Sequence, residues 1–263
     1  MVVKTSMEKD WDARAKEDAF YYVDTSQSGW DENEFFREGE RQACSLTADL
    51  LQEKGFDPKG KFMLDIGCGI GRLERGFSKM FDEVWGIDVS GEMIKKAVEL
   101  NQSENVHFVK ANGYDLSSFP DGFFDFVFSY ITFQHIPDKS ITYNYFLEIH
   151  RVLKPGGLFK IHLRRRRLFT FAFHFMPIPT AIVPYLPRWS RRIYWRLMNK
   201  HKGQLARGQT WEGSAFHESE ALKLLYALGF VDIEILEDHT HPPRTNFWCC
   251  GRKPIQDISR SAC

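Results

Sequence analysis

The sequence has no net charge and few cysteines. Its 263 residues include 35 basic and 35 acidic side chains, a balance that argues against a protein that binds nucleic acid through its whole surface. The five cysteines form no C-x-x-C pair and no metal-ligand spacing, so we expect no cysteine metal site and a reducing compartment. The first ten residues are polar and lack the apolar core of a signal peptide, which predicts a cytoplasmic protein.

Short apolar runs alternate with amphipathic stretches between residues 61 and 163. Apolar runs of this length are typical of buried strands, and apolar positions three or four residues apart are typical of helices. We expect strands at 62–66, 83–87, 106–110, 124–130 and 158–163, and helices at 70–80, 91–101 and 140–153. This alternation predicts parallel βαβ units, whose right-handed crossovers place helices on both faces of one sheet.

Further elements flank this pattern. The apolar spacing predicts two helices before it and one helix followed by two strands after it. The expected ranges are 11–22 and 32–55 for the first two helices, 217–228 for the last helix, and 231–237 and 244–252 for the strands, with a turn at 241–243. The first 60 residues hold 14 acidic and 8 basic residues, so the neutral total conceals an acidic N-terminal region.

The most specific motif is a glycine-rich loop, LDIGCGIGR, which begins at Leu64. It follows the first expected strand and opens a helix, where glycines let the backbone approach a ligand and the helix N-terminus presents unpaired N–H groups. Asp88 ends the next strand, nineteen residues after Gly69, and its carboxylate can accept hydrogen bonds from both hydroxyls of a ribose. Together the two features predict a cofactor that contains adenosine.

The spacing of the glycines distinguishes between cofactors. A dinucleotide site has the pattern G-x-G-x-x-G, whereas this loop is G-x-G-x-G with Asp65 two positions before the first glycine. A pyrophosphate gains nothing from a carboxylate directed at the loop, but a cofactor with an ammonium group and a sulfonium cation does. A nicotinamide dinucleotide site and a purely structural strand-to-helix turn are the alternatives.

As a set, the motifs resemble those of class I methyltransferases that depend on S-adenosylmethionine (SAM). They follow that family's order at residues 65–71, 88, 112–113, 124–125 and 151–157, and residues 214–253 resemble its last helix and antiparallel hairpin. The resemblance implies an α/β fold: a Rossmann-like, seven-stranded, mostly parallel sheet with helices on both faces. It also implies N-terminal helices over the site (1–60), a SAM-binding domain (61–163 and 214–253), a basic and aromatic lid inserted after the fifth strand (164–213) and a tail (254–263).

The resemblance further implies how the methionine and ribose parts of SAM are held. The loop backbone at Gly67, Cys68 and Gly69 would pack against the methionine part. Asp65 would hold its ammonium group, and Asp88 would accept hydrogen bonds from the ribose hydroxyls.

For the adenine, the resemblance points to residues after the second and third strands. Val89 and Met93 would enclose the ring. Asn112 stands where many relatives have Asp; its amide oxygen would accept from the adenine amino group, and the Gly113 N–H would donate to the ring. Ser129, at the end of the fourth strand, completes the expected cofactor site, and no metal is expected.

His135 is the candidate catalytic residue. It lies in the segment that leaves the carboxyl end of the fourth strand, the edge at which open α/β sheets bind ligands. Transfer to a hydroxyl requires a base near neutral pH, and imidazole suits that role. The alternative is a structural role, because an amine or carboxylate acceptor needs no strong base. His162, which ends the fifth strand, is a weaker candidate.

Residues 164–207 hold 11 basic residues and no acid. Between two basic clusters, residues 168–187 are uncharged and aromatic, but their four prolines argue against a membrane-spanning helix. The segment is interpreted as a lid over an apolar acceptor. Contact with an anionic membrane surface, binding of an anionic acceptor through arginine, and pairing with the acidic N-terminal region are the alternatives.

These observations predict an enzyme that methylates an apolar or anionic small molecule on O, N or C. A nucleic-acid methyltransferase is disfavoured, since no [D/N]-P-P-[Y/F] motif follows the fourth strand. The residues are also compatible with a lipid-surface methyltransferase, a non-catalytic SAM-binding partner protein and a nicotinamide-dependent dehydrogenase. Neither the acceptor nor the oligomeric state follows from the residues.

Overall fold

One seven-stranded sheet organises the residues that the computed structural model describes, which are 2–166, 213–240 and 245–255, with backbone alone for 2–6. The strand order is β3-β2-β1-β4-β5-β7-β6. Neighbours from β3 to β5 are parallel, whereas β7 runs antiparallel to both β5 and β6. The strands are β1 (Phe62–Ile66), β2 (Glu83–Asp88), β3 (Val106–Lys110), β4 (Phe124–Ser129), β5 (Leu153–Arg164), β6 (Val231–Glu237) and β7 (Asn246–Arg252).

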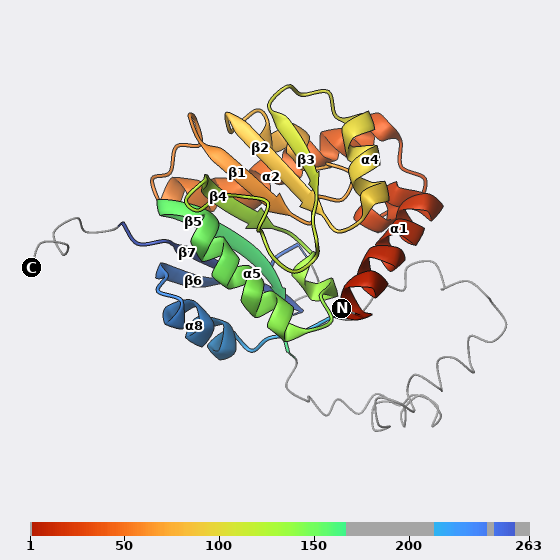
Figure 1. Cartoon of the computed structure of the whole chain (residues 1–263). Helices are drawn as coiled ribbons and strands as arrows, with labels where there is room; N and C mark the ends of the chain where they lie inside the picture. Colours follow the sequence, from red (N-terminus) through yellow and green to blue (C-terminus); the bar gives the residue numbers. More distant parts are fainter. Residues whose placement is uncertain (1, 167–212, 241–244, 256–263) are drawn as a thin grey trace, which may run out of the picture. The chain divides into compact units, whose positions relative to one another are not determined.

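Helices cover both faces of this sheet (Figure 1). The helices are α1 (Val2–Val23), α2 (Glu32–Glu53), α3 (Glu74–Phe77), α4 (Gly91–Leu100), the 3-10 turn η1 (Phe133–His135), α5 (Lys139–Val152) and α8 (Glu218–Ala227). Helices α5 and α8 pack on one face, and α2 and α3 pack on the other. The fold class expected from the sequence is therefore confirmed.

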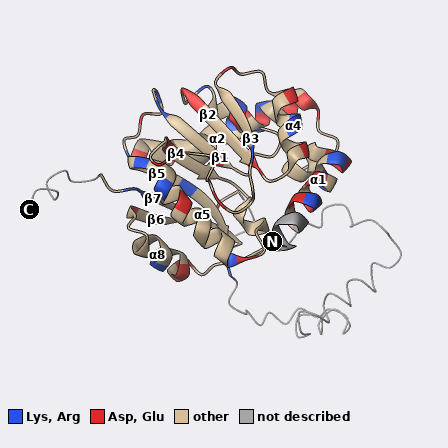
Figure 2. Cartoon of the chain, viewed as in Figure 1, with Lys and Arg blue, Asp and Glu red and all other residues tan. Residues whose placement is uncertain are grey.

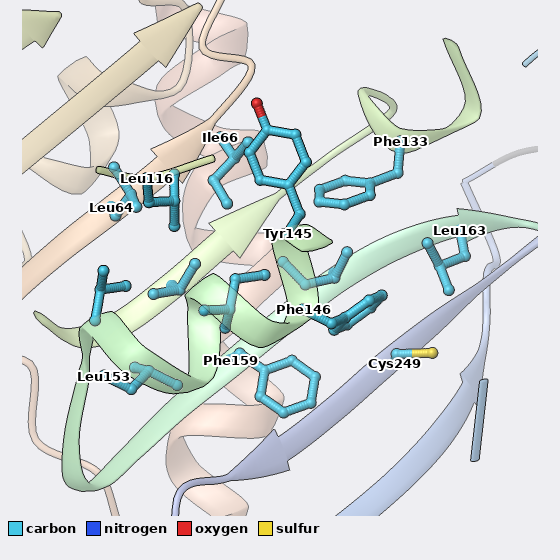
Figure 3. Close-up of a cluster of buried hydrophobic side chains, with 14 of the residues drawn as sticks. Leu64, Ile66, Leu116, Phe133, Tyr145, Phe146, Leu153, Phe159, Leu163 and Cys249 are labelled. Carbon is cyan, nitrogen blue, oxygen red and sulfur yellow. The ribbon is translucent and has the colours of Figure 1, made fainter. Parts of the chain in front are cut away.

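Two apolar clusters, one on each face, hold these layers together. Side chains alternate along β1, so Leu64 and Ile66 join the α5 side while Met63 joins the α2 side. Figure 3 shows the α5 side, where Phe146 and Phe159 lie in the same buried cluster. Burial of each side chain of this size contributes about 1.5–3 kcal/mol to the free energy of unfolding. The clusters therefore fix the positions of the strand ends.

The glycine loop is followed by a much shorter helix than the sequence predicts. The expected helix at 70–80 is wrong, because only Glu74–Phe77 are helical. Gly69 and Gly71 have φ values of +57° and +76°, outside the helical region. A Cβ at Gly71 would lie 2.5 Å from the Asn101 amide nitrogen. Residues 70–73 therefore form a turn and not the first turn of a helix.

Strand β5 begins five residues earlier than expected, at Leu153. Its pairing with β4 shifts register between Phe124 and Phe126, and Gly156 takes a φ of +81° there. Residues 154–157 are therefore a distortion inside the strand, so α5 leads into β5 without a separate loop.

Helix α1 lies beside α4 (Figure 1). A third apolar cluster joins them to α2 through Ala15, Phe35, Phe36 and Met93. Charged residues of both signs lie along α1 and α4 (Figure 2), and Lys16 pairs with Glu92 at 3.0 Å. The acidic N-terminal region thus contacts the parallel part of the sheet.

Most of the expected lid lies outside the described residues, as do the turn at 241–243 and the tail from 256 onward. Residues 164–166 continue from β5, and Arg165 forms a bridge with Phe216 beyond the insertion. Among the residues that can be described, no helix combines the length and the apolar character needed to cross a bilayer.

Candidate active site

The loop between β1 and α3 has a backbone that only glycine adopts without strain. Gly67 and Gly69 have φ values of +86° and +57°, in the region where a Cβ costs free energy. A Cβ at Gly67 would lie 2.1 Å from Thr132 Oγ1, and one at Gly69 would lie 2.8 Å from Val23 Cγ2. The loop therefore lies tightly between the segment after β4 and the end of α1.

Asp88 lies at the carboxyl end of β2 and faces this loop. Its carboxylate accepts hydrogen bonds from the Gly69 N–H at 3.1 Å and the Ser90 N–H at 2.8 Å. Burial raises its pKa to about 6, although these two hydrogen bonds lower it. The expected ribose acceptor is thus directly linked to the expected methionine-binding loop.

Helix α1 reaches the same strand end through Asp12. Its carboxylate accepts hydrogen bonds from Ser90 Oγ at 2.6 Å and from the Glu92 N–H at 3.2 Å. Ser90 is the N-cap of α4 and accepts from the Met93 N–H. These hydrogen bonds tie helix α1 to the N-terminus of α4.

Asp65 and Glu74 form a buried pair of carboxyl groups below the loop. Asp65 is 3% exposed and Glu74 is fully buried. The two carboxyl groups lie close enough to shift each other's pKa. Burial raises the pKa of Asp65 to about 7 and raises that of Glu74 well above its ordinary value. The sequence analysis missed Glu74, although it falls on the apolar face of the expected helix, beside Leu73 and Phe77.

The electrostatics of this region favour a cationic ligand. Asp65 and Asp88 raise the pKa of Glu74, Asp88 also raises that of Asp65, and Asp12 raises that of Asp88. Such a cluster attracts an ammonium or sulfonium group and repels a pyrophosphate. Within the described ranges, no three His, Cys, Asp or Glu side chains are arranged to hold a metal ion.

Of the residues expected at the adenine, Gly113 lies beside Val89. Met93 is 1% exposed, and a Cβ at Gly113 would lie 2.9 Å from Val89 Cγ2. The Asn112 amide oxygen, however, accepts hydrogen bonds from the Tyr114 and Asp115 N–H groups at 2.8 and 3.0 Å. Asn112 thus forms a turn with its own backbone, and an adenine amino group would compete with those donors.

Two other expected contacts have structural partners. The Ser129 hydroxyl is fully buried and donates to the Ile66 carbonyl at 2.6 Å, which joins β4 to β1 directly before the loop. Cys68 is 6% exposed, and burial raises the pKa of its thiol well above the ordinary value. Cys68 is therefore a neutral, unreactive thiol at neutral pH.

His135 lies at the end of η1, beside α1. Its ring contacts that of Trp11 edge to face, at 5.3 Å between centroids. The chain returns from the insertion at this point: the Gly213 N–H donates to the Gln134 carbonyl and the Ser214 N–H to the Ile136 carbonyl, each at 2.8 Å. His135 thus lies where β4, α1 and the end of the insertion meet.

A second buried polar group lies at the ends of β5 and β6. His162 and Asp238, each with a side chain 1% exposed, interact at 3.2 Å. The Thr240 hydroxyl donates a hydrogen bond to the same Asp238 carboxylate and accepts one from the Tyr130 hydroxyl. Burial raises the pKa of Tyr130 to about 12. The His162 ring therefore faces Asp238 and Tyr130, a set that the sequence analysis did not join.

Residues 64–161 match the family model described as "Methyltransferase domain". The chain is 38% identical over 112 residues to the 2-methyl-6-phytyl-1,4-hydroquinone methyltransferase of Synechocystis, which covers 41% of this chain and 34% of that protein. It is 35% identical over 134 residues to the sterol 24-C-methyltransferase erg6 of Aspergillus fumigatus, covering 48% and 34%. The chain spans between a quarter and a half of the length of these and similar curated relatives.

Solved structures show the same fold over more of the chain. The magnesium protoporphyrin IX methyltransferase of Synechocystis with bound S-adenosylhomocysteine (SAH) superposes with a TM-score of 0.60 at 15% identity, covering 95% of this chain and 99% of that one. The SAH complex of DhpI superposes with a TM-score of 0.57 at 19% identity, covering 97% and 98%. Residues 64–161 therefore match a methyltransferase domain, and the chain has the class I, Rossmann-like methyltransferase fold.

Proposed function

We propose that this protein binds SAM and transfers its methyl group to a small molecule. The supporting observation is the acidic cluster beside the glycine loop, since a buried group of carboxyls suits the ammonium and sulfonium of SAM and opposes a nicotinamide dinucleotide. The matching domain and the named relatives, which are small-molecule methyltransferases, agree with it.

Each group in the site has a proposed role. Asp65 holds the ammonium group, and the Gly67–Gly69 backbone lies along the methionine part. Asp88 holds the ribose hydroxyls, while Val89 and Met93 enclose the adenine. When bound, SAM supplies a methyl group on a sulfonium, which an acceptor nucleophile displaces in line to leave SAH. The protein's contribution is to align the two and to keep water out.

Asp88→Ala tests the cofactor assignment. We expect loss of SAM binding by calorimetry with the fold retained by circular dichroism, because the carboxylate would be the ribose acceptor. Asp121→Asn, which removes an exposed carboxylate paired with Arg151, is the control. Near-normal affinity in Asp88→Ala would refute the ribose assignment, and protection by a nicotinamide cofactor instead of SAM would favour a dehydrogenase.

His135 is the proposed general base for a hydroxyl acceptor. Its position at the end of η1, beside Trp11, supports the proposal, because the glycine loop and the described end of the insertion both adjoin this segment. We expect His135→Ala to slow turnover at least about tenfold while SAM affinity is kept. A turnover rate equal to that of the wild type would leave His135 with a structural role.

The acceptor is proposed to be an apolar or anionic small molecule. Relatives act, by their names, on a phytylated hydroquinone, a sterol and phosphoethanolamine. Residues 164–213 would form its lid, since the described ends of this segment, Arg166 and Gly213, adjoin β5 and η1. Incubation with radiolabelled SAM and fractionated extract would identify the acceptor by the lipid, polar or RNA fraction that gains label.

Three further outcomes would redirect the proposal. Label in RNA, together with a steep dependence of RNA binding on salt, would favour a nucleic-acid methyltransferase. SAM binding without label in any fraction would favour a non-catalytic partner protein. Co-sedimentation with anionic but not neutral vesicles would add membrane-surface contact through residues 164–207.

A further inference from the structure

The buried carboxyl pair, Asp65 and Glu74, lies where β1, β2 and α3 meet. Met63 and Asp65 share the face of β1 that packs toward α2 and α3, and Glu74, the first residue of α3, faces Asp65 there. Gly86 of β2 lies opposite Asp65 in the sheet register. A Cβ at Gly86 would lie 3.0 Å from Glu74 Oε1 and 2.9 Å from Cys68 Cβ. The neighbouring strand therefore leaves the space that the Glu74 carboxyl fills.

The pair lacks the partners that two ionised carboxylates require. Among the described residues, neither oxygen of Glu74 nor Asp65 Oδ1 accepts a hydrogen bond of ordinary geometry from a donor group. Two carboxylates in contact repel each other, but a carboxylic acid and a carboxylate share a strong hydrogen bond. The contact between Asp65 and Glu74 is therefore favourable only when one of them carries a proton.

We propose that Glu74 is a positioning residue that remains a neutral acid and donates a hydrogen bond to Asp65, which directs a single ionised carboxylate at the ammonium group of SAM. The inference rests on the proposed function, because it takes SAM as the ligand of Asp65. Glu74 is fully buried and both its oxygens lack a donor among the described residues, whereas for Asp65 this holds of Oδ1 alone, so the proton belongs on Glu74. The directions of the pKa shifts agree, because the interaction lowers the pKa of Asp65 and raises that of Glu74. Asp88 and the Cys68 thiol are the other titratable groups that face the pair.

The arrangement makes SAM affinity depend on pH in a specific way. As the pH falls through the pKa of Asp65, about 7, both carboxyls become protonated and the ammonium loses its partner. Binding of the cation favours ionised Asp65, so SAM binding near pH 6.5 should release a proton. Calorimetry in buffers of different ionisation enthalpy counts that proton.

The test compares two variants of nearly equal size. Glu74→Gln keeps a neutral donor and should keep SAM affinity at pH 7.5 within about threefold. Glu74→Leu removes the donor, so the pKa of Asp65 rises. The pH below which SAM affinity falls should then increase by about one unit. At a fixed pH in this range, the affinity of Glu74→Leu should be about tenfold weaker than that of the wild type. Glu220→Gln, on α8, is the control and should leave the profile unchanged.

Several results would overturn the proposal. A Glu74→Leu profile that superposes on the wild type, or that is weaker by the same factor at every pH, would mean that Glu74 acts only by packing. An equal loss in Glu74→Gln would mean that an ionised Glu74 is required.

A second measurement needs neither SAM nor a stable variant. At pH 8, infrared spectroscopy of the wild type should show the C=O band of a protonated carboxyl, which Glu220→Gln keeps and Glu74→Gln loses. Absence of that band in the wild type would refute the neutral Glu74. If the band is present but the wild type does not bind SAM, the proposed function fails and the proton assignment stands.

Discussion

Replacing Asp65 by Asn should stabilise the protein at neutral and alkaline pH while it removes SAM binding. Asp65 is buried, and its pKa is raised from 3.8 to about 7. The folded chain therefore retains a proton that the unfolded chain releases. This contribution to stability is complete below about pH 4 and is lost as the pH rises through about 7.

The pKa values set the size of the effect. A shift of one unit corresponds to about 1.4 kcal/mol, so a rise from 3.8 to about 7 corresponds to about 4 kcal/mol. Asn does not ionise and escapes this cost. We expect the free energy of unfolding of Asp65→Asn, relative to the wild type, to increase by about 2–4 kcal/mol between pH 4.5 and pH 8.

Urea unfolding of both proteins at pH 4.5, 6 and 8 measures this difference, since titratable groups that do not interact with Asp65 cancel. Asp121→Asn, which removes an exposed carboxylate, is the control. SAM at one hundred times its Kd should stabilise the wild type by about 2.7 kcal/mol and leave Asp65→Asn unchanged. A difference that stays constant or shrinks as pH rises would refute the raised pKa of Asp65.

Three further changes test the site. Gly67→Ala should abolish SAM binding by calorimetry and lower the free energy of unfolding by at least about 2 kcal/mol, because its Cβ would meet Thr132 at a φ of +86°. The control is Gly60→Ala, since Gly60 has a φ of +69° with open space around it. Its free energy of unfolding should fall by only about 1 kcal/mol. Asp12→Ala should weaken SAM binding about three- to tenfold, since α1 loses its hydrogen bonds to Ser90 and Glu92. The circular dichroism spectrum should stay the same. Unchanged affinity would show that α1 does not close the site. In a Cys263→Ser background, a thiol reagent should modify Cys44, which is exposed, while Cys68, Cys249 and Cys250 react only on unfolding; rapid modification of Cys68 would contradict its burial.

The sequence predicted the parallel part of the sheet closely, and the reason is physical. β1 and β3 occupy the expected ranges, because a strand buried on one or both faces needs an uninterrupted or alternating apolar pattern that is visible in the chain itself. The glycine loop with Asp65 and Asp88 was equally visible, since a turn of positive φ next to a ligand leaves few residue choices.

The errors fall where distant parts of the chain decide the outcome. Residues 70–73 have helical spacing, but contacts of Gly71 with Asn101 hold them in a turn. Asn112 is a different case: its amide oxygen accepts hydrogen bonds from two backbone N–H groups of its own turn, and its contact with adenine stays a prediction.

The sequence alone determined which strands form, where the cofactor loop lies and which acid follows it, because these depend on residues adjacent in the chain. Only the tertiary structure placed Glu74 against Asp65, Asp12 against Ser90, and His162 against Asp238. No residue pattern in the sequence indicates which of these side chains meet. The burial that raises the pKa values of the carboxyls exists only once the layers have packed.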